Sequence, residues 1–123
     1  MQKIALLSGS ILAFLAVAIG AFGAHGLQSI LEANQRVDTF ETAVKYHMYH
    51  ALALLLTGVL LQYYPGRLME NSVWLFIAGI LVFSGSLYIL SITNIKVLGA
   101  ITPIGGLCFL IAWAMLAISF WKS

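Results

Sequence analysis

The chain has 123 residues, of which 62% are apolar and only 8% are charged, and its mean hydropathy is +1.01. Soluble domains carry about 25% charged residues, so this composition cannot supply an ordinary water-facing surface. The sequence therefore predicts an integral membrane protein. Its net charge of +2 is dispersed along the chain and excludes nucleic acid as a partner.

Four apolar segments follow one another, each close to the roughly 20 residues that a helix needs to cross a bilayer. We place these helices at residues 4–24, 39–63, 72–92 and 98–121. The connections after the second and third segments are short, so consecutive helices must be antiparallel neighbours. The predicted fold class is all-α: a single transmembrane domain over residues 1–123, formed by a four-helix antiparallel bundle with up-down-up-down topology.

The first segment has some features of a signal peptide, because Lys3 precedes an apolar stretch that contains small residues. We favour a retained helix, since the apolar residues continue to Ala24. Small residues that let another backbone approach closely share one face of this helix and also follow the fourth segment from Gly105 to Ser119. Besides the lipid bilayer, the expected partner is therefore a second copy of the chain, in a homo-oligomer formed through these faces.

The second segment begins with the stretch FETAVKYHMYH, residues 40–50, which gathers charged and aromatic polar side chains at the edge of an apolar run. Asp38 and Glu41 have the spacing of a capping box, which predicts a helix start near Thr39. On a helical wheel, Tyr46, His47 and His50 point in one direction, toward the bundle. Glu41 and Lys45 point elsewhere and are expected to form an ion pair at the rim.

The topology places most polar side chains in the leaflet opposite the termini, where lipid contact would cost several kcal/mol for each. We therefore expect a polar pocket on that side. Its candidate residues come from all four helices: His25, Tyr46, His47, His50, Ser84, Tyr88 and Thr102. If a metal is bound, its ligands are expected to be His25, His47 and His50, because three imidazoles suit a transition metal.

Four blocks of the sequence resemble one known family. They are GAFGAHGL at residues 20–27, FETAVKYHMYHALALLL from residue 40, FSGSLY at residues 83–88 and TPIGG at residues 102–106. In this order they are similar to the small bacterial membrane family known as domain of unknown function 423, and more distantly to transmembrane protein 256. The resemblance implies a four-helix inner-membrane protein of unassigned function, and it supplies no catalytic residues.

Three functional interpretations remain open, in this order of preference. The first is a non-enzymatic structural or accessory membrane component. The second is a protein that binds or conducts an ion, a proton or a small polar molecule through the polar pocket. The third is a histidine-ligated metal or haem site, although no cofactor is predicted. The sequence contains no nucleophile or cofactor motif, which weighs against an enzyme.

The expected location is the bacterial cytoplasmic (inner) membrane, which the chain crosses several times. The side with the termini carries Lys3, Arg67, Lys122 and the amino group, against Arg36, Lys96 and Lys45 on the other side. The positive-inside rule therefore favours termini in the cytoplasm by a small margin.

Overall fold

The computed structural model describes residues 1–123, and every regular element in it is a helix. Along the chain these are α1 (Gln2–Ala18), the π-helical turn η1 (Ile19–Gly23), α2 (Ala24–Gly26), α3 (Gln28–Ala33), α4 (Val37–Leu60), α5 (Arg67–Gly79), the π-helical turn η2 (Ile80–Ser84), α6 (Gly85–Thr93) and α7 (Leu98–Lys122). The absence of strands confirms the predicted all-helical class.

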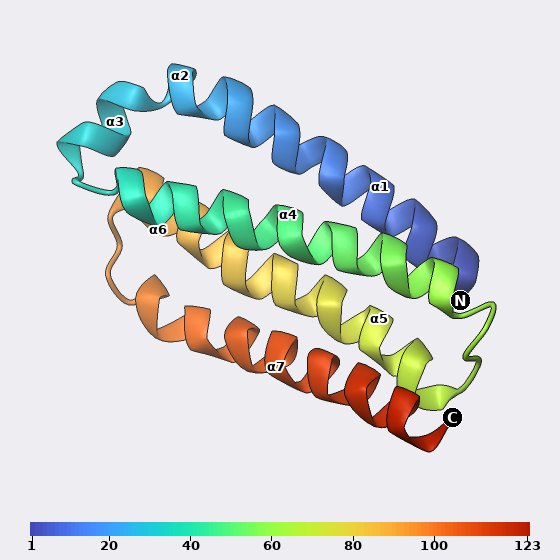
Figure 1. Ribbon diagram of the computed structural model, residues 1–123. Helices are drawn as coiled ribbons and strands as arrows, with labels where there is room; N and C mark the ends of the chain where they lie inside the picture. Colours follow the sequence, from blue (N-terminus) through green and yellow to red (C-terminus); the bar gives the residue numbers. More distant parts are fainter.

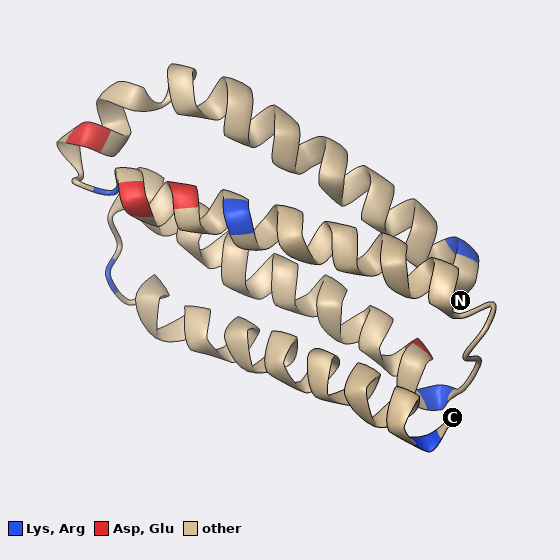
Figure 2. Ribbon diagram, in the orientation of Figure 1, with Lys and Arg blue, Asp and Glu red and all other residues tan.

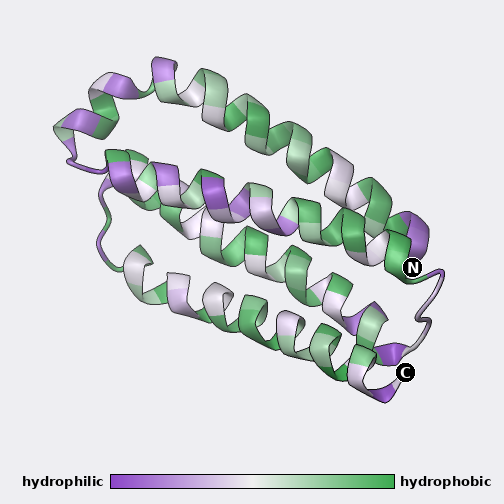
Figure 3. Cartoon of the chain, in the orientation of Figure 1, coloured by the Kyte–Doolittle hydropathy of each residue, from purple (hydrophilic) through white to green (hydrophobic).

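The long helices lie side by side, with both chain termini at one end and α2 and α3 at the other (Figure 1). The segments Gln2–Gly26, Arg67–Thr93 and Leu98–Lys122 are long and apolar enough to cross a membrane. The fourth long helix, α4, is outside this set because its first half carries Asp38, Glu41 and Lys45 as well as two histidines. Most charged residues lie at the two ends of the molecule and hydrophobic ones along the helices between them, except on the first half of α4 (Figures 2 and 3).

Packing follows the order of the chain. Helix α1 packs on α4, α4 packs on the continuous helix α5–η2–α6, and α7 packs on that helix from its other side. Neither α1 nor α4 forms an extensive interface with α7. One flank of α1 and one flank of α7 therefore keep their apolar side chains exposed, as at Phe14 and Leu110.

Glycines bring the packed backbones together. A Cβ added at Gly9 would lie 3.0 Å from the Ala51 carbonyl oxygen, and one at Gly58 would lie 2.8 Å from the Leu6 side chain, so α1 and α4 are in close contact. A Cβ at Gly105 would lie 2.7 Å from the Phe83 Cα, so α7 sits directly on the backbone of η2. Small residues thus serve helix packing within the chain.

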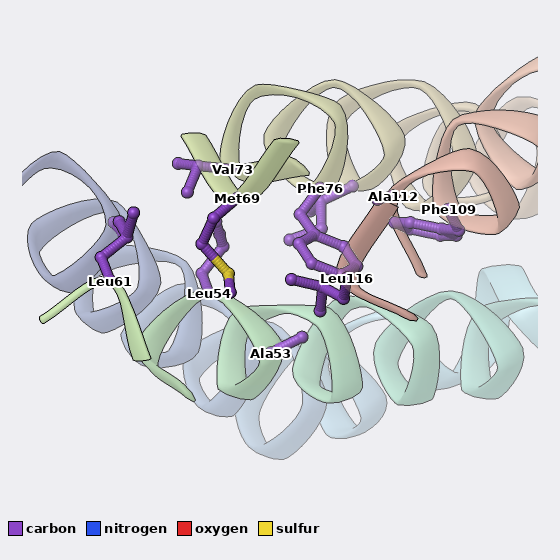
Figure 4. Close-up of a cluster of buried hydrophobic side chains, with 11 residues drawn as sticks. Ala53, Leu54, Leu61, Met69, Val73, Phe76, Phe109, Ala112 and Leu116 are labelled. Carbon is purple, nitrogen blue, oxygen red and sulfur yellow. The ribbon is translucent and has the colours of Figure 1, made fainter. Parts of the chain in front are cut away.

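The larger apolar cluster gathers side chains of α1, α4, α5 and α7 and extends from Leu61 and Met69 to Phe109 (Figure 4). Met69, Val73 and Phe76 of α5 lie at its centre and are fully buried. Leu54 of α4 and Leu116 of α7 pack against them from two sides. A smaller apolar cluster of Ala43, Leu87 and Leu90 lies toward the other end, beside the polar side chains described below.

Two predicted helix starts need adjustment. The capping box is wrong: α4 begins at Val37, and no side chain caps its first turn. The chain reverses instead at Gln35, whose φ of 55° is left-handed, and the Arg36 amide donates to the carbonyl of Leu31 at 2.9 Å. Helix α5 begins at Arg67, directly after Gly66, and so starts ahead of the expected residue 72.

Candidate functional site

The candidate residues lie between the middle of the long helices and the end that contains α2, α3 and the connection from α6 to α7. We call this part of the structure the loop half. Both π-helical turns, η1 and η2, also lie there. Such turns insert an extra residue into a helix and are frequent at functional sites. Beside η1, the glycines Gly20 and Gly23 leave space that Val44 and Phe40 of α4 fill.

His47 joins α4 to α6. Its Nδ1 lies 2.8 Å from the hydroxyl oxygen of Tyr88, and its side chain is only 3% exposed. The Phe40 ring packs on Tyr88 with ring centroids 5.7 Å apart, which shields the pair on one side. The other ring nitrogen, Nε2, is buried and has no hydrogen-bond partner. One ring nitrogen of His47 is therefore bonded to Tyr88, and the other is buried without a hydrogen-bond partner.

His50 joins α4 to α7, and its contacts define its tautomer. The Tyr46 carbonyl oxygen lies 2.7 Å from Nδ1 and can only accept, so Nδ1 carries a proton. The Trp113 indole N–H donates to Nε2 at 3.1 Å, so Nε2 provides a lone pair. The neutral ring also stacks on Phe109, with centroids 3.6 Å apart and planes 7° apart. Neither nitrogen of His50 is free to bind a ligand.

Ser84 and Thr102 also bond to neighbouring helices. The Ser84 hydroxyl donates to the Ala43 carbonyl of α4 at 2.8 Å. The Thr102 hydroxyl lies 2.6 Å from that of Ser86, which connects α7 to α6. Both side chains are buried, at 0% and 9% exposure. They occupy the contacts between helices and line none of the larger cavities described below.

His25 lies apart from the other two histidines. It is exposed on α2 and borders a separate cavity of about 250 Å³, which Gln28, Glu32 and Glu41 also line. No three side chains of the histidine, cysteine, aspartate and glutamate types are arranged to hold a metal ion. The three-histidine set is therefore not assembled in this structure.

Glu41 and Lys45 are both exposed and lie one turn apart on α4. Their ion pair stays a prediction. Tyr46 is 40% exposed, and its ring packs on Phe83 with centroids 4.8 Å apart. Its ring also packs on His50 and on Phe109 of α7, so Tyr46 belongs to a different group from His47 and Tyr88.

The hollow beside Tyr46 and His50 is apolar. It is an open groove of about 750 Å³ between α4 and α7, bordered by Tyr46, Tyr49 and His50 on one side and by Pro103, Gly106 and Trp113 on the other. The sequence analysis did not predict this groove. The available signal was the pair of small or rigid residues one turn apart on a helix otherwise rich in large ones.

The sequence prediction also missed a polar connection at the loops. The Asn34 side-chain amide donates to the carbonyls of Ser91 and Ile92, each at 3.0 Å, at the C-terminal end of α6. The Arg36 Nε donates to Asn94 Oδ1 at 3.1 Å. Asn94 has a left-handed backbone, φ 56°, and ends α6. Helix ends leave carbonyls without partners, and Asn34 supplies donors to two of them.

Comparison with known proteins supports the resemblance. Residues 19–106 match the family described as Protein of unknown function (DUF423). UPF0382 membrane protein YwdK of Bacillus subtilis is 47% identical over 119 residues, which cover 96% of each chain. UPF0382 membrane protein SAB0533 of Staphylococcus aureus is 49% identical over 124 residues, which cover 98% of each chain. No solved structure matches the chain. The family predicted from the four sequence blocks is thereby confirmed.

Proposed function

The chain belongs to the DUF423 family of membrane proteins of unknown function, and on that premise we propose that it is a non-enzymatic structural or accessory component of the bacterial cytoplasmic membrane. It crosses the membrane four times as an antiparallel up-down-up-down bundle. It forms one domain, and its polar side chains in the loop half hold the helices in register.

The four crossings are supported by the length and surroundings of α4. Its 24 residues extend about 36 Å at 1.5 Å per residue, enough for a hydrocarbon core of about 30 Å. It lies between α1 and α5, and both of its neighbours belong to segments apolar enough to cross a membrane. Its charged residues, Asp38, Glu41 and Lys45, fall in its first turns, where they reach the interface.

One observation carries the structural role: the buried polar side chains of the loop half bond mainly to other helices of the same chain. His47 pairs with Tyr88, His50 accepts from Trp113, and Ser84 donates to Ala43. In a membrane the hydrophobic effect does not drive helices together, so packing and hydrogen bonds between helices supply the attraction. These hydrogen bonds therefore contribute to holding the helices together, a role that the hydrophobic effect has in a soluble bundle.

A second function has one specific observation in its favour. The buried Nε2 of His47 has no partner, which leaves a polar atom that a proton, a water molecule or a small polar ligand could meet. This is the alternative of binding or permeation. It would use His47 and Tyr88 alone among the seven candidate residues.

Homo-oligomer formation also stays a prediction. Several of the small residues on which it was based, including Gly9, Gly20 and Gly105, already pack against other helices of the same chain. The lipid-exposed flanks of α1 and α7 remain available for a second copy. Termini in the cytoplasm and the absence of a cofactor are likewise part of the proposal.

The test separates the alternatives with one preparation. The protein is purified in mild detergent, its absorption spectrum and metal content are measured, and it is reconstituted for proton and ion flux assays. The structural role predicts a spectrum with only aromatic absorption, metal well below one equivalent, and no flux above that of empty liposomes. A flux that is lost in His47→Ala and kept in His25→Ala would instead support permeation.

A further inference from the structure

We propose that the groove between α4 and α7 binds one hydrocarbon chain of an anionic lipid, with the headgroup beside Lys45. This ligand site goes beyond the structural role proposed above and does not depend on it.

The groove exists because α7 is drawn toward η2. Gly105 rests on the Phe83 backbone, which places α7 against the third helical segment and leaves it without a broad contact to α4. The Phe83, Phe109 and Trp113 rings fill the inner part of the space between α4 and α7. Its outer part stays open because Gly106 has no side chain and Pro103 has a short one.

The position of the groove identifies its surroundings. It lies along the exposed flank of α7, a helix long and apolar enough to cross a membrane. From Pro103 to Trp113 it extends about 15 Å at 1.5 Å per residue. A hollow on this flank faces lipid tails, and its almost entirely apolar walls offer a tail dispersion contacts without a polar penalty.

The size and rigidity of the groove favour a hydrocarbon chain that stays bound over one that exchanges freely with the surrounding lipid. Its volume of about 750 Å³ is in the range of sites that hold small organic ligands, about 300–1,000 Å³. Its floor is formed by His50, which is fixed by two hydrogen bonds and stacked on Phe109. A rigid floor lowers the cost of ordering the site when the chain binds.

The polar end of the groove favours a negative headgroup. Tyr46 and Tyr49 line the groove at the end nearer the loops, and the exposed ammonium of Lys45 lies one turn before Tyr49 on the same face of α4. Aromatic and basic side chains at this depth are typical of the lipid headgroup level. A phosphate there would meet Lys45 in place of Glu41, the partner expected from the sequence, while its chain follows α7 inward.

The test uses the fluorescence of Trp113. In a Trp74→Phe/Trp121→Phe background, Trp113 is the remaining tryptophan. The protein is reconstituted into phosphatidylcholine vesicles that contain increasing fractions of phosphatidylglycerol or phosphatidylcholine brominated on one acyl chain. We expect half-maximal quenching at an about five-fold lower fraction of brominated phosphatidylglycerol, the preference that one lysine near the surface provides. Lys45→Gln should remove this preference.

A matched pair of variants tests the groove itself. A Cβ at position 106 would lie 3.8 Å from the Phe83 ring, an ordinary contact, so Gly106→Ala should quench like the parent. The longer side chain of Gly106→Leu occupies the groove and should reduce quenching by both lipids. Three results would each overturn the proposal. The first is equal quenching by the two lipids, and the second is unchanged quenching in Gly106→Leu. The third is a Trp113 that neither lipid quenches because a second copy of the chain covers it.

Discussion

The indole N–H of Trp113 donates to Nε2 of His50 at 3.1 Å, and this bond joins α4 to α7, whose backbones form no broad interface. Because Nε2 of His50 accepts this bond while Nδ1 donates to the Tyr46 carbonyl, the ring is neutral and both its nitrogens are engaged. A histidine that looks like a ligand in the sequence is thus a connection between α4 and α7.

Replacement of Trp113 by phenylalanine should destabilise the protein. The Trp113→Phe variant keeps an aromatic ring beside Phe76 but leaves Nε2 of His50 buried without a donor. We expect the free energy of unfolding in detergent to fall by about 1 kcal/mol, as for hydrogen bonds between membrane helices. The control is Trp121→Phe, because Trp121 is 89% exposed. Equal stability of both variants would contradict the assigned role.

The contact between Gly105 and η2 predicts a larger effect. In Gly105→Ala, the new Cβ would lie 2.7 Å from the Phe83 Cα, and a backbone cannot yield as a side chain can. We expect a loss of about 1–3 kcal/mol in the free energy of unfolding, as for overpacked sites. In the control Gly99→Ala, the nearest atom lies 4.0 Å away. A Gly105→Ala variant as stable as this control would show that α7 is not held at the position described.

Replacement of Asn34 should lower the local stability of the loop half more than the stability of the whole protein. The Asn34 side-chain amide joins the end of α3 to the end of α6 by donating to the carbonyls of Ser91 and Ile92. The Asn34→Ala variant removes both of these hydrogen bonds. We expect faster hydrogen exchange in residues 28–36 and 91–95, with a loss of about 0.5–1.5 kcal/mol for local opening. Exposed Ser29, for which no side-chain bond is found, provides the control Ser29→Ala. Unchanged exchange in both segments would refute this connection.

Four crossings fix which residues share a side of the membrane. Cysteines are introduced one at a time into a Cys108→Ser background and labelled with a membrane-impermeant maleimide. Ser29→Cys and Ile95→Cys should react from one side, and Gln62→Cys and Ser123→Cys from the other. If α4 did not cross, Ser29→Cys and Gln62→Cys would react from the same side.

The helical class and the family could be predicted from the sequence because both depend on residues that are close together along the chain. Apolar runs near 20 residues long define the helices, and FETAVKYHMYH and TPIGG identify the family. The position at which a helix begins also depends on the conformation of the residues that precede it. Asp38 and Glu41 have the spacing of a cap, but α4 starts earlier because the left-handed Gln35 already reverses the chain.

The partners of the polar side chains could not be predicted, because they depend on how the helices are rotated and spaced. The wheel placed Tyr46, His47 and His50 together, yet His47 faces Tyr88 on α6 whereas His50 faces Trp113 on α7. The sequence did not indicate which groups Asn34 would bond to, since an asparagine in a loop has many possible partners. The groove depends on the approach of Gly105 to Phe83, which only the folded chain displays.

The central claim is that polar side chains in the loop half act as connections between helices, and a double-mutant cycle on His47 and Tyr88 tests it most directly. The free energies of unfolding of His47→Ala, Tyr88→Phe and the double variant are compared with that of the parent. Because His47 is buried, Tyr88 is partly buried and their polar atoms lie 2.8 Å apart, we predict a coupling energy of about 0.5–2 kcal/mol. Strict additivity, within about 0.3 kcal/mol, would contradict the account.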